Sequence, residues 1–376
     1  MTARLSALQR RLAVAESRPD EDWLVLVENV PAWPPGQRPD LTHVVADHAA
    51  PYSYLPSRGA PALVEAIAAR ERKVSGSSLI GAAHIAVTAG GMNAIGTILR
   101  DCFDAGYRKT VHAIPTFRGV RDSMAAAGLS PHAVALTGSA MDWELLAAEC
   151  TEPTVLYVNL PHNPTGIVPT AEYLAGLEDF AASHDVFVLY DAVYDSFLFR
   201  ERGRPAPVDV AIGHRGFTIV NSMSKNYGRP GDRIGWIVAH EQTLDRLLPR
   251  LEWEAVCVNS RAQAEAAAVI DGGNEVLLAA VETGREAYRE HAAGHPVLDV
   301  PVPDGGTQHW LDLRVPDIEA FADFALDAHR LVLTTSANYA PSPAGSIRFP
   351  TGVAPELIRA GLERLGRVLA DWEERS

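Results

Sequence analysis

The sequence predicts an α/β fold, with a mostly parallel sheet between helices and a smaller α+β unit toward the carboxyl end. Continuous apolar runs such as Val186–Asp191 alternate with helical patterns, which is typical of strands buried on both faces. Most of these runs end in a glycine or a single polar residue. At 376 residues and 47% hydrophobic content, the chain is long enough for one large domain or two linked domains.

The expected elements follow one another in a regular order. An amphipathic helix over about 3–17 leads into an irregular, proline-rich arm from Val30 to Pro56. Two long helical stretches, about 241–270 and 274–292, separate the sheet from the smaller unit. Strands are expected at about 85–89, 110–114, 154–159, 186–191, 217–221, 234–238, 310–313 and 331–334, and the other helices at about 60–72, 93–103, 118–127, 170–182, 317–329 and 354–373.

The composition excludes several function classes. A formal net charge of −14 argues against binding to nucleic acid or to an anionic membrane. No apolar run approaches the roughly 20 residues that a membrane-spanning helix needs, and the first helix lacks the apolar stretch of a secretion signal. The three cysteines have no metal-ligand spacing and are interpreted as free thiols in a reducing compartment. We therefore expect a cytoplasmic protein without a metal site.

One lysine has a neighbourhood suited to covalent chemistry. The chain has only three lysines among its 33 basic residues. Lys73 and Lys109 stand in charged, turn-like settings that predict solvated side chains. Lys225 instead follows an apolar run, with Ser222 before it and Arg233 after it. A desolvated amine beside cationic or phosphate-binding groups is activated as a nucleophile.

Other candidate residues follow the predicted strands. In a parallel-rich sheet the carboxyl ends of the strands meet at one crevice, which is where such folds bind ligands. We therefore expect one site to contain the residues at these strand ends, which are Gly90 and Gly91, Phe117, Asn163, Asp191 and Lys225.

Four motifs carry a family resemblance. Asn163-Pro-Thr-Gly, Asp191-x-x-Tyr194, Ser222-x-Ser224-Lys225 and Arg233-x-Gly235 occur in the order and approximate spacing of fold-type I pyridoxal phosphate (PLP) enzymes. Within these, the chain resembles the class I/II aminotransferases, the aspartate aminotransferase superfamily, from about Asn29 to Arg348. The resemblance implies PLP as cofactor and a seven-stranded sheet. It also implies a large domain over 49–284, and a small domain formed by a helix and arm over 1–48 and by residues 285–376.

The resemblance assigns a role to each motif residue. Lys225 would hold PLP as an aldimine and later exchange protons with the substrate. Asp191 would pair with the pyridine nitrogen, so that the ring withdraws electrons from the substrate. Tyr194 and Asn163 would hydrogen-bond the phenolic oxygen, and Phe117 would stack on the ring. Without the family, Asp191 and Asn163 are ordinary turn residues and Phe117 is a core residue.

The phosphate of PLP has its own predicted site. A glycine turn that ends a strand and begins a helix directs backbone amides and the helix dipole at an anion. Met92 stands where relatives often carry Ser or Thr, so one side-chain donor is missing. The expected phosphate contacts are Gly90, Gly91, Met92, Ser222 and Arg233, and Ser224 is expected to contact the cofactor.

A tyrosine in the arm predicts the oligomeric state. Tyr54 lies in Tyr-Leu-Pro-Ser-Arg-Gly59, which is similar to the family segment whose tyrosine reaches the phosphate of the neighbouring subunit. This implies a homodimer with shared active sites. The alternative is an exposed loop tyrosine.

The substrate side departs from the family in several places. Arg348 matches the arginine that binds the substrate α-carboxylate, together with Asn163. Asn29 replaces a glycine of the arm, while Gln308 and His309 stand where relatives often carry aromatic residues. A structural role for His309 is the alternative, and Asp232 is interpreted as a local partner for an arginine. We therefore expect a polar substrate side chain, contacted by Asn29, Gln308 and His309.

The predicted reaction is transamination of an L-α-amino acid with a 2-oxo acid, through the Lys225 aldimine and a quinonoid intermediate. The alternative is a PLP-dependent cyclase, lyase or oxidase of an amino acid such as an arginine derivative, in secondary metabolism. These enzymes form the same carbanion as an aminotransferase. They differ in which group protonates it and in which group leaves. A third hypothesis, a PLP-binding transcription regulator, is disfavoured because the chain is acidic and has no basic DNA-binding segment.

Overall fold

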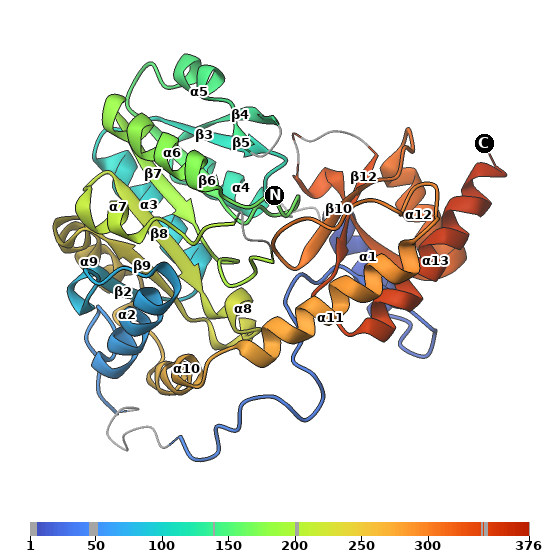
Figure 1. Ribbon diagram of the computed structural model, residues 1–376, viewed down its shortest axis with the longest axis horizontal. Coiled ribbons are helices and arrows are strands. Elements are labelled where there is room, and N and C mark those ends of the chain that lie inside the picture. Colours follow the sequence, from blue (N-terminus) through green and yellow to red (C-terminus); the bar gives the residue numbers. More distant parts are fainter. Residues whose placement is uncertain are drawn as a thin grey trace.

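Two β-sheets organise the computed structural model (Figure 1), which describes residues 6–44, 52–137, 140–199, 203–339, 341 and 345–375. The larger sheet has the strand order β2-β9-β8-β7-β6-β3-β4-β5, and the smaller one β1-β11-β12-β10. The strands are β1 (Leu24–Leu26), β2 (Ile85–Thr88), β3 (Lys109–Ile114), β4 (Ser130–Thr137), β5 (Ala140–Met141), β6 (Thr154–Asn159), β7 (Val186–Asp191), β8 (Phe217–Ser222), β9 (Gly235–Ala239), β10 (Gln308–Asp312), β11 (Leu331–Thr335) and β12 (Ser346–Pro350).

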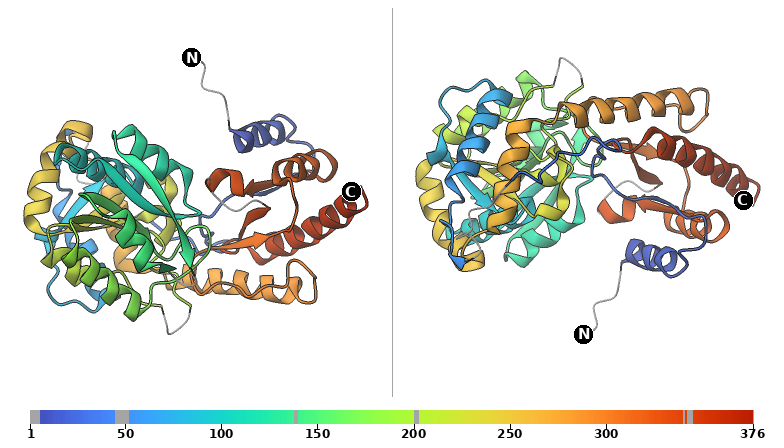
Figure 2. Two further views of the ribbon diagram at one scale, coloured as in Figure 1. Left: turned by 90° about the horizontal axis from the view of Figure 1, so that it is seen from above. Right: turned by 90° about the horizontal axis from the view of Figure 1, so that it is seen from below.

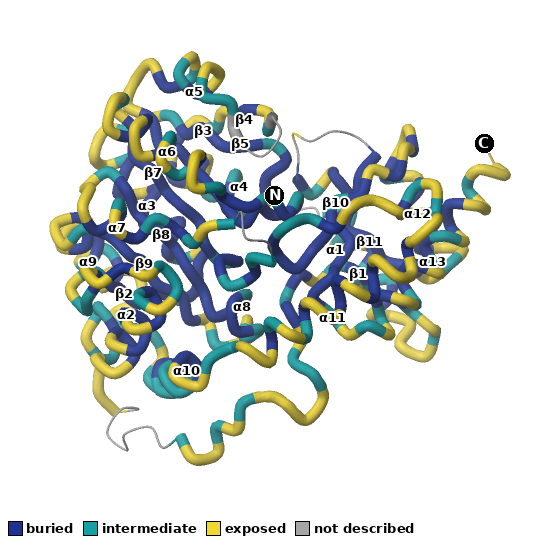
Figure 3. The backbone as a smooth tube through the Cα atoms, in the orientation of Figure 1, coloured by how far each residue is buried: buried dark blue, intermediate teal, exposed yellow. Residues whose placement is uncertain are grey.

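The larger sheet is mostly parallel, as predicted. Strands β4, β3, β6, β7 and β8 pair in parallel, and β9 is antiparallel to both β2 and β8. These seven strands form the body of the sheet, which β5 extends by two residues at one edge. The residues of the central strands are buried throughout (Figure 3), because helices cover both faces.

The helices divide into two layers and a separate group around the smaller sheet. One face of the larger sheet shares a core with α2, α5, α6, α7 and α10, and the other with α3, α4 and α9. These helices are α2 (Pro61–Ser75), α3 (Gly91–Asp104), α4 (Arg118–Ala126), α5 (Trp143–Glu149), α6 (Ala171–Ser183), α7 (Val208–Gly213), α9 (Glu241–Ala255) and α10 (Ser260–Gly272). The short α8 (Met223–Asn226) follows β8 directly.

The smaller sheet joins the two ends of the described chain. Strand β1, near the amino end, pairs in parallel with β11, and β12 is antiparallel to β11 and β10. Figure 2 shows α11 and α13 side by side on one side of this sheet, with α1 on the opposite side. The helices of this region are α1 (Ala7–Glu16), α11 (Glu275–Ala292), α12 (Ile318–His329) and α13 (Pro355–Glu373).

Helix α11 runs from the larger body to the smaller one (Figure 1). Near its start, Leu277 and Val281 pack in a cluster with Tyr194. Near its end, Ala287 and Tyr288 belong to the core of the smaller sheet. The domain boundary predicted at 284/285 falls inside this helix, where its packing changes from one body to the other.

Several elements differ from the prediction. The stretch expected as one helix over 241–270 is interrupted at Val256, whose φ of 57° lies in the left-handed region. Strands β1, β4, β5 and β12 and helices α5, α7 and α8 are not among the expected elements. Lys109 is also a correction: its side chain is only 12% exposed, and its Nζ pairs with Glu149. Residues 3–5 of the predicted helix and 45–51 of the predicted arm lie outside the described residues. Within the described chain, no helix is long and apolar enough to cross a membrane.

Candidate active site

A cavity of about 420 Å³ lies at the carboxyl ends of the central strands, against the arm. It brings together residues that are far apart in sequence, because β6, β7 and β8 end at the same edge of the sheet. The predicted site residues that line it are Asn29, Gly91, Met92, Phe117, Asn163, Asp191, Tyr194, Ser222, Ser224, Lys225, Arg233 and Arg348. Other lining residues, which sequence reasoning did not identify, include Val27, Glu28, Tyr157 and Asn159.

Lys225 reaches the cavity from α8, the short helix after β8. Ser222 caps this helix, since its Oγ accepts a hydrogen bond from the Ser224 amide at 3.1 Å. The Nζ of Lys225 donates to Asn29 Oδ1 at 2.6 Å. Burial and then the nearby Arg348 lower the pKa of Lys225 to about 8, against the opposing charge of Glu28. The amine is therefore largely shielded from water and is a stronger nucleophile at neutral pH than an ordinary lysine.

Asp191 ends β7 and is buried below the cavity. Its Oδ2 accepts a hydrogen bond from the Tyr157 hydroxyl at 2.6 Å, and its Oδ1 accepts one from the Val193 amide at 3.3 Å. Burial raises the pKa of Asp191 to about 6, although both hydrogen bonds oppose the increase. A carboxylate held in this way favours a cationic partner. Tyr157 could have been suspected from sequence as a hydroxyl inside an otherwise apolar strand.

The start of α3 and Arg233 form a corner suited to an anion. Gly90, the residue before α3, has φ 88°, and a Cβ added there would collide with the guanidinium of Arg233. Arg233 is fixed by a 2.9 Å hydrogen bond to the Pro230 carbonyl and lies 3.5 Å from Ser224 Oγ. Backbone amides, a hydroxyl and a guanidinium therefore converge at one end of the cavity.

Arg348 defines the opposite side of the cavity. It lies in β12 and donates to the Val27 carbonyl of the arm at 2.5 Å. Its other terminal nitrogen is 3.4 Å from Asn163 Oδ1, and its guanidinium lies 5.7 Å from the Tyr339 ring centroid. The arginine is thus oriented by the arm and by the loop after β6.

The structure does not support two of the predicted substrate contacts. Gln308 and His309 do not line the cavity, and both side chains are buried elsewhere in the structure. Gln308 donates to the His162 carbonyl at 3.3 Å, and His309 packs edge-on against Tyr288 with 4.8 Å between ring centroids. Burial lowers the pKa of His309 to about 3, so this histidine is neutral. Gln308 therefore joins β10 to the loop after β6 of the larger body, whereas His309 packs against the core of the smaller body.

Gly90, Tyr54 and Asp232 are also absent from the lining of this cavity. Tyr54 is 81% exposed, so its predicted contact with a neighbouring subunit remains a prediction. Asp232 pairs with Arg229, in agreement with its interpretation as a local partner for an arginine.

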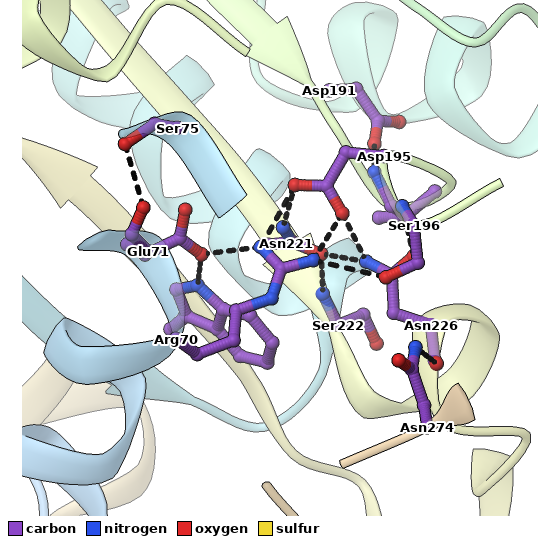
Figure 4. A network of polar contacts seen from close by, with 12 residues as sticks. Arg70, Glu71, Ser75, Asp191, Asp195, Ser196, Asn221, Ser222, Asn226 and Asn274 are labelled. Atoms are coloured by element: carbon purple, nitrogen blue, oxygen red, sulfur yellow. Dashed lines mark hydrogen bonds and ion pairs between the residues drawn. The ribbon is translucent and has the colours of Figure 1, made fainter. Parts of the chain in front are cut away.

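A buried ion-pair network supports the loop that carries Lys225 (Figure 4). Arg70 lies between two carboxylates, Glu71 and Asp195. The amides of Asn221 and Asn226, which flank the segment from Ser222 to Lys225, donate to Asp195 at 2.9 and 2.8 Å. The network therefore fixes both ends of the segment that bears the lysine.

Comparisons with known proteins agree with this geometry. The family model described as aminotransferase class I and II matches residues 39–365. The chain is 36% identical to a 3-methylarginine biosynthesis aminotransferase of Streptomyces arginensis, over 97% of this chain and 96% of the relative. It is 34% identical, with the same coverage, to an L-aspartate:5-guanidino-3-methyl-2-oxopentanoate transaminase of Pseudomonas syringae pv. syringae. An aspartate aminotransferase structure from Thermotoga maritima superposes with a TM-score of 0.85 at 21% identity, covering 98% of each chain.

The residues of the cavity fit PLP, the cofactor of this family. The buried Asp191 carboxylate suits a protonated ring nitrogen, and the corner at Gly90 and Arg233 suits a phosphate. Phe117 leaves 43% of its surface exposed beside the cavity, which a stacked ring would cover. Lys225 supplies the amine that the aldehyde of PLP requires.

Proposed function

Because this chain belongs to the class I and II aminotransferase family, and so is a PLP-dependent aminotransferase with amino acid and oxo acid substrates, we propose that its substrate has a guanidino side chain. The amino acid would be arginine or a close derivative, and its partner the corresponding 2-oxo acid.

The proposal assigns each side of the cavity one part of the reaction. When bound, PLP supplies the aldehyde carbon that receives the amine and the ring that withdraws electrons from the substrate α-carbon. Arg348 binds the substrate α-carboxylate by paired hydrogen bonds. Asp191 would hold the positive charge of the ring nitrogen, and Lys225 Nζ would accept the proton of the α-carbon and pass it to the cofactor carbon that carries the amine.

The observation that carries the proposal is the carboxylate of Glu28. Apart from Asp191, Glu28 is the only carboxylate among the described lining residues, and it has no hydrogen bond or ion pair with the described part of the chain. Its charge acts on the pKa of both Lys225 and Tyr194, so it lies close to the reacting centre. A guanidinium is the side-chain group that binds a carboxylate with two parallel hydrogen bonds.

The cavity also has room for a long side chain near Glu28. A second cavity of about 650 Å³ shares Glu28, Val30 and Pro230 with the first. The three-carbon chain and guanidinium of arginine could extend into this space while the α-carboxylate stays at Arg348.

The two relatives support the same substrate class. Their names specify 3-methylarginine biosynthesis and a 5-guanidino-3-methyl-2-oxopentanoate substrate, and each matches nearly the whole chain. The polar side chain expected from sequence is consistent with a guanidino group.

The test compares charge and shape at position 28. Glu28→Gln keeps the shape of the side chain and removes its charge. We expect kcat/KM for arginine to fall about 10- to 100-fold, since a hydrogen bond to a charged group is worth about 1.5–3 kcal/mol. The value for methionine should change less than about twofold. Glu16→Gln, at an exposed position of α1, is the matched control.

The outcomes test two points separately, namely which amino acid is the substrate and which residue binds its side chain. If no guanidino amino acid is turned over while neutral amino acids are, the proposed substrate class is wrong. If arginine is a substrate and Glu28→Gln is as active as the control variant, the guanidinium is recognised elsewhere. Oxygen uptake or ammonia release, in place of 2-oxo acid formation, would favour the oxidase or lyase alternative.

We also propose that the enzyme is a homodimer in which Tyr54 completes the phosphate site of the partner subunit. The support is the family resemblance and the exposure of Tyr54, which is 81%. In sedimentation experiments we expect the mass of a dimer. Tyr54→Phe should weaken PLP binding about 10- to 100-fold, as expected for one lost hydrogen bond to a charged group. A monomer with full activity would contradict the proposal.

A further inference from the structure

The arm residue Asn29 connects Lys225 to Tyr194, another side chain that lines the cavity. It is 8% exposed, so its side-chain amide is largely enclosed. The amide oxygen accepts the hydrogen bond from Lys225 Nζ at 2.6 Å, and the amide nitrogen donates to the Tyr194 hydroxyl. The amide oxygen is thus bonded to Lys225 and the amide nitrogen to Tyr194, both within the cavity.

The backbone around Asn29 is fixed by both bodies of the molecule. The Thr307 hydroxyl donates to the Asn29 carbonyl at 2.9 Å, from the loop before β10. Further along the arm, the Trp33 indole donates to the Tyr227 carbonyl at 2.9 Å, next to α8. The position of the Asn29 amide is therefore set independently of its contact with Lys225.

The charges around Lys225 oppose one another, so they do not by themselves fix the position of its amine. Arg348 and Arg233 repel a protonated Lys225, whereas Glu28 and Asp191 attract it. A neutral acceptor at 2.6 Å adds direction without adding charge. When one N–H of the neutral amine points to Asn29, the lone pair of Nζ is left free to point elsewhere.

We propose that Asn29 is a positioning residue. It holds the free amine of Lys225 during the stage in which the substrate, and not Lys225, is bonded to the cofactor. During this stage Nζ must take the proton from the substrate α-carbon and deliver it to the carbon of the cofactor that carries the amine, so no proton is gained or lost overall. Asn29 keeps the amine at one place and in one orientation for both transfers. The proposal does not depend on which amino acid is the substrate.

The chain offers a direct chemical test, because it has only three lysines. The full-length holoenzyme is converted to its aminated form, in which Lys225 has no bond to the cofactor. Trace amounts of isotope-labelled acetic anhydride are then applied across a pH series, and mass spectrometry gives the titration of each lysine. Lys73, which is 75% exposed, is the internal reference.

Two substitutions should move the titration of Lys225 in opposite directions. Asn29→Gly removes the acceptor, so the ammonium loses a hydrogen bond, and the midpoint should fall by about 0.5–1 pH unit. Asn29→Asp adds a negative charge, so the midpoint should rise by one unit or more. Glycine is the residue expected at this place in relatives, so the backbone should tolerate it. Circular dichroism and the midpoint of thermal unfolding check the fold of both variants.

Kinetics distinguishes positioning from a general loosening of the arm. With an α-deuterated substrate, Asn29→Gly should lower kcat about 10- to 100-fold and increase the isotope effect, because proton transfer becomes slower relative to other steps. KM should change little. Asn29→Asp should recover part of kcat at high pH, where its lysine is again neutral. Thr307→Val loosens the arm and keeps the amide, so it is the matched control.

The proposal fails if Asn29→Gly leaves both the labelling profile of Lys225 and the isotope effect as in the wild type. It also fails if Thr307→Val reproduces both changes, since arm position alone would then account for them.

Discussion

The two sides of the active-site cavity are built in different ways. The sheet side, formed by Asp191, Ser222 and Lys225, rests on buried strands and on the ion-pair network of Arg70. The arm side, residues 27–30, is irregular chain held by separate hydrogen bonds from the smaller body. Polar groups on the sheet side are largely partnered, whereas Glu28 on the arm side has no partner among the described residues. The sheet side is thus fixed by buried structure, whereas the arm side carries the two residues, Glu28 and Asn29, on which both proposals above depend.

The largest expected effect is on the sheet side. Lys225→Ala should lower turnover by about 10⁴-fold or more, because it removes both the nucleophile and the proton carrier. Borohydride reduction of the wild-type holoenzyme followed by peptide mapping should modify Lys225 alone. Lys109→Ala, which removes the partly buried lysine paired with Glu149, is the control and should retain activity. Labelling of Lys109 or Lys73 would contradict the assignment.

The second effect concerns the support of the sheet side. Arg70→Met leaves Glu71 and Asp195 buried without their cation, which should lower the free energy of unfolding by about 3–5 kcal/mol. Arg261→Met breaks an ion pair whose arginine is 82% exposed, and should cost about 0–1 kcal/mol. Urea unfolding at neutral pH measures both values. Equal stability of the two variants would mean that the network does not support the loop.

The smallest expected effect is the pH dependence of stability that Asp191 causes in the cofactor-free protein. Its folded pKa is about 6, above the ordinary value of 3.8, so the folded protein binds this proton more readily than the unfolded chain does. Stability of the cofactor-free protein should therefore fall as the pH rises from about 4 to 6, by about 3 kcal/mol in total. Asp191→Asn should remove this decline and be the more stable protein at pH 7.

With PLP bound, the order should reverse, because an amide cannot neutralise a protonated ring nitrogen. Urea unfolding at about pH 4 and 8, with and without PLP, checks both halves of this prediction. If Asp191→Asn gains as much stability from PLP as the wild type does, the role assigned to the carboxylate is wrong.

The sheet side could be predicted from sequence, whereas most of the arm side could not. Asp191 and Lys225 follow uninterrupted apolar strands, so local pattern was sufficient to place them at one edge of the sheet. Glu28 and Asn29 belong to irregular chain whose position depends on β11, β12 and Thr307, hundreds of residues away. The same reasoning failed for Gln308 and His309, because alternation along a strand does not reveal which face meets the cavity and which meets a second core.

The placement of α11 has a mechanical consequence. One end of this 18-residue helix packs against Tyr194 and the other is embedded around Tyr288, beside β10. An α-helix resists bending along its length, so any rotation of the smaller body would be carried as a tilt to the side chains beneath the reacting centre. Closure of the smaller body over a substrate would then move Tyr194 at the same time, because α11 connects the two.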